Sequence, residues 1–234
     1  MKNTKLFIKA LKYKIVGITS RETAPVRWHK SFLLYPFRLF FHPIETFNDL
    51  KYEGKSSMII ANAMAILFFI VRLLQQTSTG YLFMPGGNDD VSLFTVFAIS
   101  IGALLIFTIC NWSTSTLVDG EGSMGDIWIA LTYSLLPYIL FTSLNIMLSY
   151  VFTTTEATFY NFFSFFGLAW TVILIFLGLM VVHQYTVTKT VFSVFATLLI
   201  IVCFVFLLLL FVSIYQQIYS FVMNIIREIV VRQL

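Results

Sequence analysis

Apolar residues are concentrated in long stretches of the chain that shorter polar segments separate. Each stretch is continuous rather than alternating, and each can cross an apolar layer about 30 Å thick at about 1.5 Å per helical residue. Continuous runs are typical of membrane-spanning helices and not of barrel strands. The pattern predicts an all-α polytopic membrane bundle of five transmembrane helices, over residues 58–74, 93–110, 126–152, 162–182 and 191–212.

A short amphipathic helix is predicted ahead of the first span, over residues 43–54. Pro43 suits the first helical position, because the amide hydrogen that proline lacks would have no partner there. Ile44, Phe47 and Leu50 share one face at helical spacing. Such an interfacial helix is expected to lie in the headgroup plane with its apolar face in the lipid.

The last segment, residues 213–234, also repeats apolar side chains with a helical period. No glycine or proline interrupts the chain after the fifth span. The segment therefore either continues the fifth helix beyond the bilayer, bends to lie along the membrane surface, or packs on a partner. The repeating positions are Ile214, Ile218, Phe221, Val222, Ile225 and Ile229.

Composition supports a membrane protein. Apolar residues make up 59% of the chain and charged residues 11%, against about 45–50% and about 25% in soluble domains. These values exclude a soluble globular enzyme, a disordered tail and a secreted disulfide scaffold. Along the chain, we expect three regions: a basic segment 1–57, a five-span domain 58–212 and a C-terminal amphipathic helix 213–234.

Charge is distributed unevenly and predicts the orientation. Residues 1–57 carry 11 Lys or Arg and four acidic residues, whereas residues 58–234 carry four and seven. The positive-inside rule places the N-terminus in the cytoplasm, and an odd number of spans then places the C-terminus outside. The basic segment is expected to contact anionic lipid rather than nucleic acid, since no recognition motif accompanies it.

The polar segment between the second and third spans is the candidate interaction loop. A calcium loop of the EF type would need a glutamate at its twelfth position, where this chain has Ala130. Ser123 and Asp126 instead match a capping box that opens the third span. A turn and a cap are therefore favoured over a metal site. The candidate residues are Asp119, Glu121, Asp126 and Trp128.

No motif for catalysis, for a cofactor or for a metal is present, so we expect a protein that is not an enzyme and has no cofactor. Within the spans the charged residue is Arg72, which is expected to reach the headgroups. Asn62 and Asn145 are expected to form hydrogen bonds between helices, and Pro137 to kink the third span.

One stretch resembles a known family. The run from Cys110 to Pro137 contains the acidic glycine turn, Trp128 at the helix start and the sequence Tyr133-Ser-Leu-Leu-Pro137-Tyr. It resembles bacterial members of the Yip-domain family, named for Ypt/Rab-interacting membrane proteins. His42-Pro43 before a charged amphipathic helix is similar too. The resemblance covers residues 40–215, and the Asp-Leu-Tyr-Gly-Pro motif of the eukaryotic branch is absent.

The resemblance implies a non-enzymatic protein that acts through other proteins or through membrane organisation. Bacterial members are similar to companions of transport systems, including carbohydrate importers. We expect a cell-membrane scaffold or accessory subunit that contacts lipid and other membrane proteins, as a homo- or hetero-oligomer. Its inner face would combine the basic segment, residues 119–126 and residues 183–190. The alternative is a small transporter with a path lined by Asn62, Arg72, Asn145 and Ser149.

Overall fold

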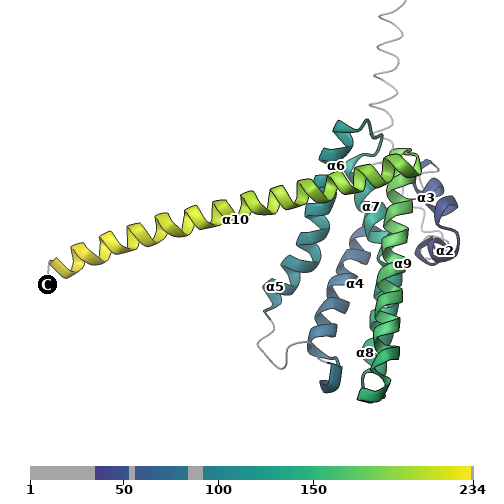
Figure 1. Cartoon of the computed structure of the whole chain (residues 1–234), viewed down its shortest axis with the longest axis horizontal. Helices are drawn as coiled ribbons and strands as arrows, with labels where there is room; N and C mark the ends of the chain where they lie inside the picture. The colour runs from purple at the N-terminus through teal and green to yellow at the C-terminus, as the bar shows by residue number, and fades with distance from the viewer. Residues whose placement is uncertain (1–34, 53–55, 84–91, 233–234) are drawn as a thin grey trace, which may run out of the picture.

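The computed structural model describes residues 35–52, 56–83 and 92–232 (Figure 1). All regular elements of these residues are helical. Five helical segments among them are long and apolar enough to cross a bilayer, which confirms the predicted all-α architecture. These segments are Met58–Thr77, Leu93–Leu117, Met124–Leu148, Thr154–His183 and Val187–Glu228.

The elements keep one order along the chain. They are α2 (Tyr35–Phe41), α3 (Pro43–Tyr52), α4 (Met58–Thr77), the 3-10 turn η2 (Tyr81–Phe83), α5 (Leu93–Phe97), the π-helical turn η3 (Ala98–Gly102), α6 (Ala103–Leu117), α7 (Met124–Ser134), α8 (Leu136–Leu148), the 3-10 turn η4 (Thr154–Glu156), α9 (Ala157–His183) and α10 (Val187–Arg232).

The centre of the bundle is formed by α4, the α7–α8 pair and α9, with α5 and α6 beside them (Figure 1). The third span is the most buried, because α4, α6 and α9 all pack against it. Its buried side chains include Ile127 and Tyr133, which pack with Leu174 of α9. Ala61 of α4 is fully buried in the same cluster, and its small side chain lets the helices approach closely.

The third span breaks where proline was expected to kink it. α7 ends at Ser134 and α8 begins at Leu136, with Pro137 in the first turn of α8. Proline has no amide hydrogen to donate to the preceding turn, so the helical hydrogen bonding is interrupted there. The amide of Tyr138 donates to Thr171 Oγ1 of α9 at 3.1 Å. The third span is thus interrupted next to the proline that was expected to kink it.

The second span is longer than predicted. α6 continues through Leu117, so residues 111–117, expected to be loop, are helical. The polar side chains of Asn111, Thr114 and Ser115 are buried against neighbouring elements. Their polarity suggested a loop in water, whereas in the structure they form hydrogen bonds inside the protein.

The fifth span and the C-terminal segment form one helix, α10, with no break between residues 212 and 213. Of the alternatives left open by the sequence, the structure has the continuous helix. Its first turns pack on α6 and α9, and the side chains of residues 202–228 are all exposed. In Figure 1 α10 runs crosswise to the packed helices.

Loops divide the bundle into two ends. We name as the proximal end the one that holds α3 and residues 118–123 and 184–186. The distal end holds residues 78–83 and 149–156. Most of the basic segment 1–57, and the predicted helix end at Gly54, lie outside the described residues.

Candidate functional site

α3 is docked on the bundle by its apolar face. Phe47 is 1% exposed and Leu50 is also buried, whereas Ile44 is 49% exposed. The ring of Phe47 lies against α9 at Gly178, where a Cβ atom would be 2.9 Å from Phe47 Cζ. The expectation that this face enters the lipid is therefore wrong for Phe47 and Leu50. The helical period identified the apolar face but could not tell whether protein or lipid covers it.

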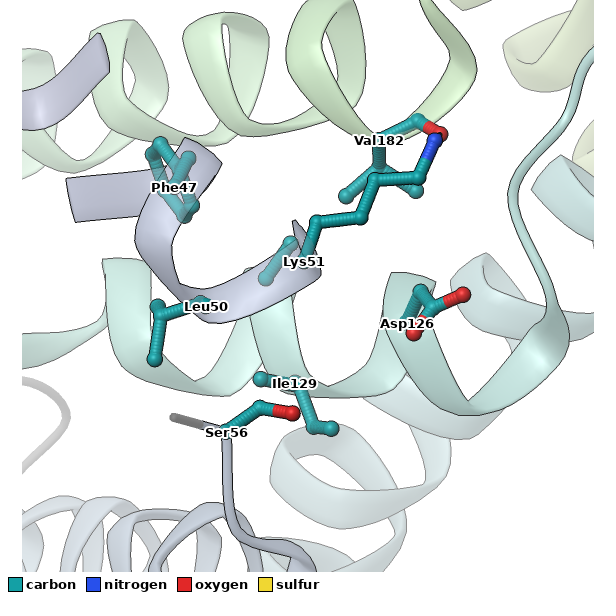
Figure 2. Close-up of a pocket in the computed structure, with 8 residues that line it drawn as sticks. Phe47, Leu50, Lys51, Ser56, Asp126, Ile129 and Val182 are labelled. Atoms are coloured by element: carbon teal, nitrogen blue, oxygen red, sulfur yellow. Dashed lines mark hydrogen bonds between the residues drawn. The ribbon is translucent and has the colours of Figure 1, made fainter. Parts of the chain in front are cut away.

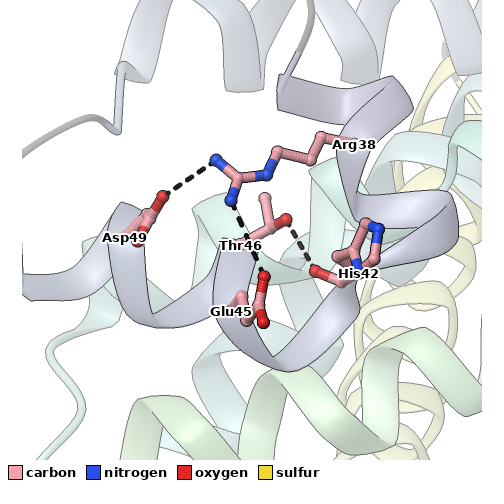
Figure 3. A network of polar contacts seen from close by, with 5 residues as sticks. All are labelled: Arg38, His42, Glu45, Thr46 and Asp49. Atoms are coloured by element: carbon pink, nitrogen blue, oxygen red, sulfur yellow. Dashed lines mark hydrogen bonds and ion pairs between the residues drawn. The ribbon is translucent and has the colours of Figure 1, made fainter.

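Polar contacts tie α3 to α2 (Figure 3). Arg38 pairs with Asp49 at 3.3 Å and with Glu45 at 3.7 Å. The hydroxyl of Thr46 donates to the backbone oxygen of His42 at 2.7 Å. Because ion pairs with solvent access contribute only about 0–1 kcal/mol, the buried face of α3 rather than these pairs holds the helix in place.

A small pocket lies between α3, α7 and the end of α9 (Figure 2). The ammonium of Lys51 donates to the backbone oxygen of Val182, at the carboxyl end of α9. That contact suits the negative end of the helix dipole. Lys51 thus joins α3 to the last turn of α9. The pocket is lined by Phe47, Leu50, Lys51, Ser56, Asp126, Ile129, Ala130 and Val182.

Asp126 and Trp128, two of the four predicted loop residues, lie on α7 rather than in the loop. Ser123 Oγ accepts from the amide of Asp126 at 3.2 Å, and Asp126 Oδ2 accepts from the amide of Ser123 at 3.2 Å. The predicted capping box is therefore confirmed. Trp128 Nε1 donates to Asn62 Oδ1 at 2.9 Å, a predicted contact between helices. The candidate loop is corrected to residues 118–123.

The cap gives a direct prediction. Ser123→Ala removes the side-chain acceptor and should lower the free energy of unfolding by about 1 kcal/mol. Ser92→Ala is the matched control, because Ser92 also precedes a helix but its side chain makes no capping hydrogen bond. Thermal unfolding of the detergent-solubilised variants measures both. Equal destabilisation by the two substitutions would contradict the role given to Ser123.

Residues 118–123 are pressed against the end of α9. Asp119 has a φ of 53°, in the left-handed region that residues other than glycine adopt mainly in tight turns. A Cβ atom at Gly120 would lie 2.7 Å from His183 Nδ1, and one at Gly122 would lie 2.6 Å from Val182 Cγ1. Only glycine allows this approach. The loop backbone is thereby fixed, while the carboxylates of Asp119 and Glu121 stay exposed.

Beneath this loop, three helices share a buried hydrogen-bond network that we name the His183 cluster. His183 of α9 contacts Asn111 Oδ1 of α6 at 3.0 Å through Nε2. Asn111 Nδ2 donates to Thr197 Oγ1 of α10 at 3.1 Å, and Thr197 donates to Thr114 at 3.2 Å. All four residues are buried. This cluster was not predictable from a local sequence pattern, because His183 and Asn111 lie 72 positions apart.

Tyr185 completes the packing between α9 and α10. Its ring stacks on that of His183 with centroids 5.1 Å apart, and Lys189 Nζ lies 4.7 Å from the Tyr185 ring centroid. Burial raises the pKa of Tyr185. The phenol therefore stays protonated to a higher pH than an exposed tyrosine would. These contacts of the Tyr185 ring hold α9 and α10 together.

A family model described as the Yip1 domain matches residues 37–210. The chain belongs to the Yip1-domain family. The matched range contains α3, the loop 118–123, the His183 cluster and the first half of α10. A search of curated proteins and a search of solved structures each found no match.

The polar residues considered for a transport path are engaged in hydrogen bonds in this Yip1-domain protein. Each has a separate partner, and none of them lines the pocket beside α3. No observation on these residues favours the transporter alternative. The contacts are Asn62 with Trp128 at 2.9 Å, Arg72 with Tyr138 at 2.9 Å, Asn145 with Ser164 at 2.7 Å and Ser149 with Gly80 at 2.8 Å.

Proposed function

We propose that this Yip1-domain protein is a non-enzymatic scaffold or accessory subunit that binds a partner membrane protein at its proximal end. The observation that carries the proposal is the loop 118–123. Its backbone is fixed by contacts of Gly120 and Gly122, while Asp119 and Glu121 are exposed. Rigid presentation of charge lowers the entropy lost on binding.

Apolar side chains lie next to these carboxylates in the chain. Leu117, just before the loop, is 77% exposed, and Met124, just after it, is half-exposed. An apolar centre with charges around it is typical of a protein interface. The partner surface that fits would combine an apolar patch with Lys or Arg side chains, because opposite charges favour the correct orientation.

The charge of the chain suggests where this surface works. The excess of Lys and Arg in residues 1–57 favours a cytoplasmic N-terminus, which would place the proximal end on the cytoplasmic face of the cell membrane. An odd number of spans would then place the C-terminus outside, which requires α10 to turn from its crosswise position (Figure 1) into the bilayer. Both assignments are part of the proposal.

The kind of partner follows from the branch of the family to which we assign the chain. The Asp-Leu-Tyr-Gly-Pro motif of eukaryotic members is absent, which supports a place among the bacterial members. Those members resemble companions of transport systems. We therefore propose that the partner belongs to a transport system, such as a carbohydrate importer.

The test compares acidic residues at opposite ends of the bundle. Asp119→Asn combined with Glu121→Gln removes both loop charges, whereas Glu156→Gln removes one at the distal end and keeps a capping box, which accepts glutamine. Each variant is expressed in its native membrane, crosslinked and isolated in mild detergent with its partners.

Loss of one stoichiometric partner from the double variant alone is the expected result. The same partner recovered with the wild type and the double variant, or no stoichiometric partner with the wild type, would refute the proposal. Reporter fusions after Leu234 test the orientation, and a cytoplasmic signal there would refute the outside C-terminus.

A further inference from the structure

A single arginine lies inside the distal part of the first span. Arg72 is five residues before the end of α4, which corresponds to about 7.5 Å along the helix axis. Tyr81 and Tyr150 lie in the distal loops with strongly exposed rings. Exposed tyrosines are typical of the headgroup level of a membrane. Arg72 is therefore placed below that level, on the apolar side of the lipid phosphates of this leaflet.

Neutral groups hold the guanidinium of Arg72 in position. Its Nη1 donates to Gln75 Oε1 at 2.8 Å and to the hydroxyl of Tyr138 at 2.9 Å. The same hydroxyl donates to Gln75 Oε1 at 3.2 Å. The phenol proton, its lone pair and the amide oxygen are thus all engaged. These contacts fix the orientation of the guanidinium but leave its charge uncompensated.

No carboxylate pairs with Arg72 among the residues that the structure describes. Glu156, in the distal loops, is engaged in the cap of η4, where it accepts from the amide of Thr153 at 3.1 Å. Within the same described ranges, Nε and Nη2 of Arg72 make no hydrogen bond. These two nitrogens form the edge of the guanidinium that binds two oxygens of one phosphate or carboxylate.

We propose that Arg72 binds the phosphate group of a phospholipid in the leaflet at the distal end. A charged side chain within a span is costly unless an opposite charge or water compensates it. A phosphate diester supplies the negative charge and two oxygens, and the lipid chains would lie along the apolar surface of α4. The inference stands apart from the proposed function, which concerns the proximal end.

The experiment uses the full chain reconstituted in phosphatidylglycerol vesicles and released for native mass spectrometry. The wild type is expected to retain a bound phospholipid. Arg72→Gln should weaken retention about tenfold or more, since it removes a charge-assisted contact. Arg72→Lys keeps the charge but loses the two-nitrogen edge, so it should fall between them. Lys189→Gln removes one cation at the proximal end and should retain lipid as the wild type does.

A second variant and a titration with inorganic phosphate complete the experiment. Tyr138→Phe removes the hydroxyl that orients the guanidinium, and it should weaken retention even if Arg72→Gln does not fold. Inorganic phosphate is titrated into detergent-solubilised wild type to distinguish a soluble phosphate from a lipid. Retention that is equal in the wild type, Arg72→Gln and Tyr138→Phe overturns the proposal. Binding of inorganic phosphate without retention of phospholipid overturns the assignment to a lipid.

Discussion

Phe47→Ala is expected to destabilise the protein by about 3–5 kcal/mol, the cost of emptying a fully buried aromatic site. Phe47 is the largest buried side chain of α3 and fills the space that Gly178 leaves on α9. Its loss removes the main apolar contact between α3 and the bundle, so we also expect α3 to detach. Lys51 would then lose its place beside the carbonyl of Val182.

The matched control is Ile44→Ala on the same helix. Ile44 is about half-exposed, so the change should stay within about 0.5 kcal/mol. Unfolding in detergent measures stability, and hydrogen exchange of residues 43–52 measures docking. Similar losses for both substitutions would show that α3 is held by something other than its buried face.

The second large effect is expected in the His183 cluster. Asn111→Leu leaves His183 buried without a hydrogen-bond partner, because Nδ1 of this ring already has none. It also removes the donor to Thr197 of α10. Leaving buried polar groups unsatisfied costs about 1–3 kcal/mol each. We therefore expect a loss of about 2–4 kcal/mol and weaker packing of α10 on α6.

A double variant separates this explanation from a simple change of shape. His183→Leu alone should also destabilise, since it leaves Asn111 Oδ1 unsatisfied. Asn111→Leu combined with His183→Leu should lose less than the sum of the single losses, because apolar groups then replace both partners. Strictly additive losses would refute the coupling. Chemical unfolding of all four proteins measures it.

Features that depend on local chemistry were predictable from the sequence. The five apolar stretches follow from the size of the bilayer, and the break at Pro137 follows from the missing amide hydrogen. The capping box of Ser123 and Asp126 involves residues three positions apart. In each case the residues that determine the feature are neighbours in the chain, so a local sequence pattern predicts it.

Features that depend on distant partners were not predictable. The apolar face of α3 was visible, but its cover is α9, more than a hundred positions later. Residues 111–117 looked like a solvated loop because their partners, His183 and Thr197, are invisible in a local window. A polar side chain at a helix end has the same appearance in the sequence whether water or another helix satisfies it.

The contacts that close the proximal end also impose an order on biosynthesis. Lys51 and Val182 are 131 positions apart, Tyr52 and Gln184 are 132 apart, and Asn111 and Thr197 are 86 apart. Contacts at the distal end span fewer positions, with Tyr150 and Ser78 72 apart and Ser149 and Gly80 69 apart. A ribosome must therefore deliver α9 and the start of α10 before α3 and the loop 118–123 acquire their final neighbours. A truncated or half-inserted chain would lack the finished surface, so a partner that recognises it would assemble only with completed molecules.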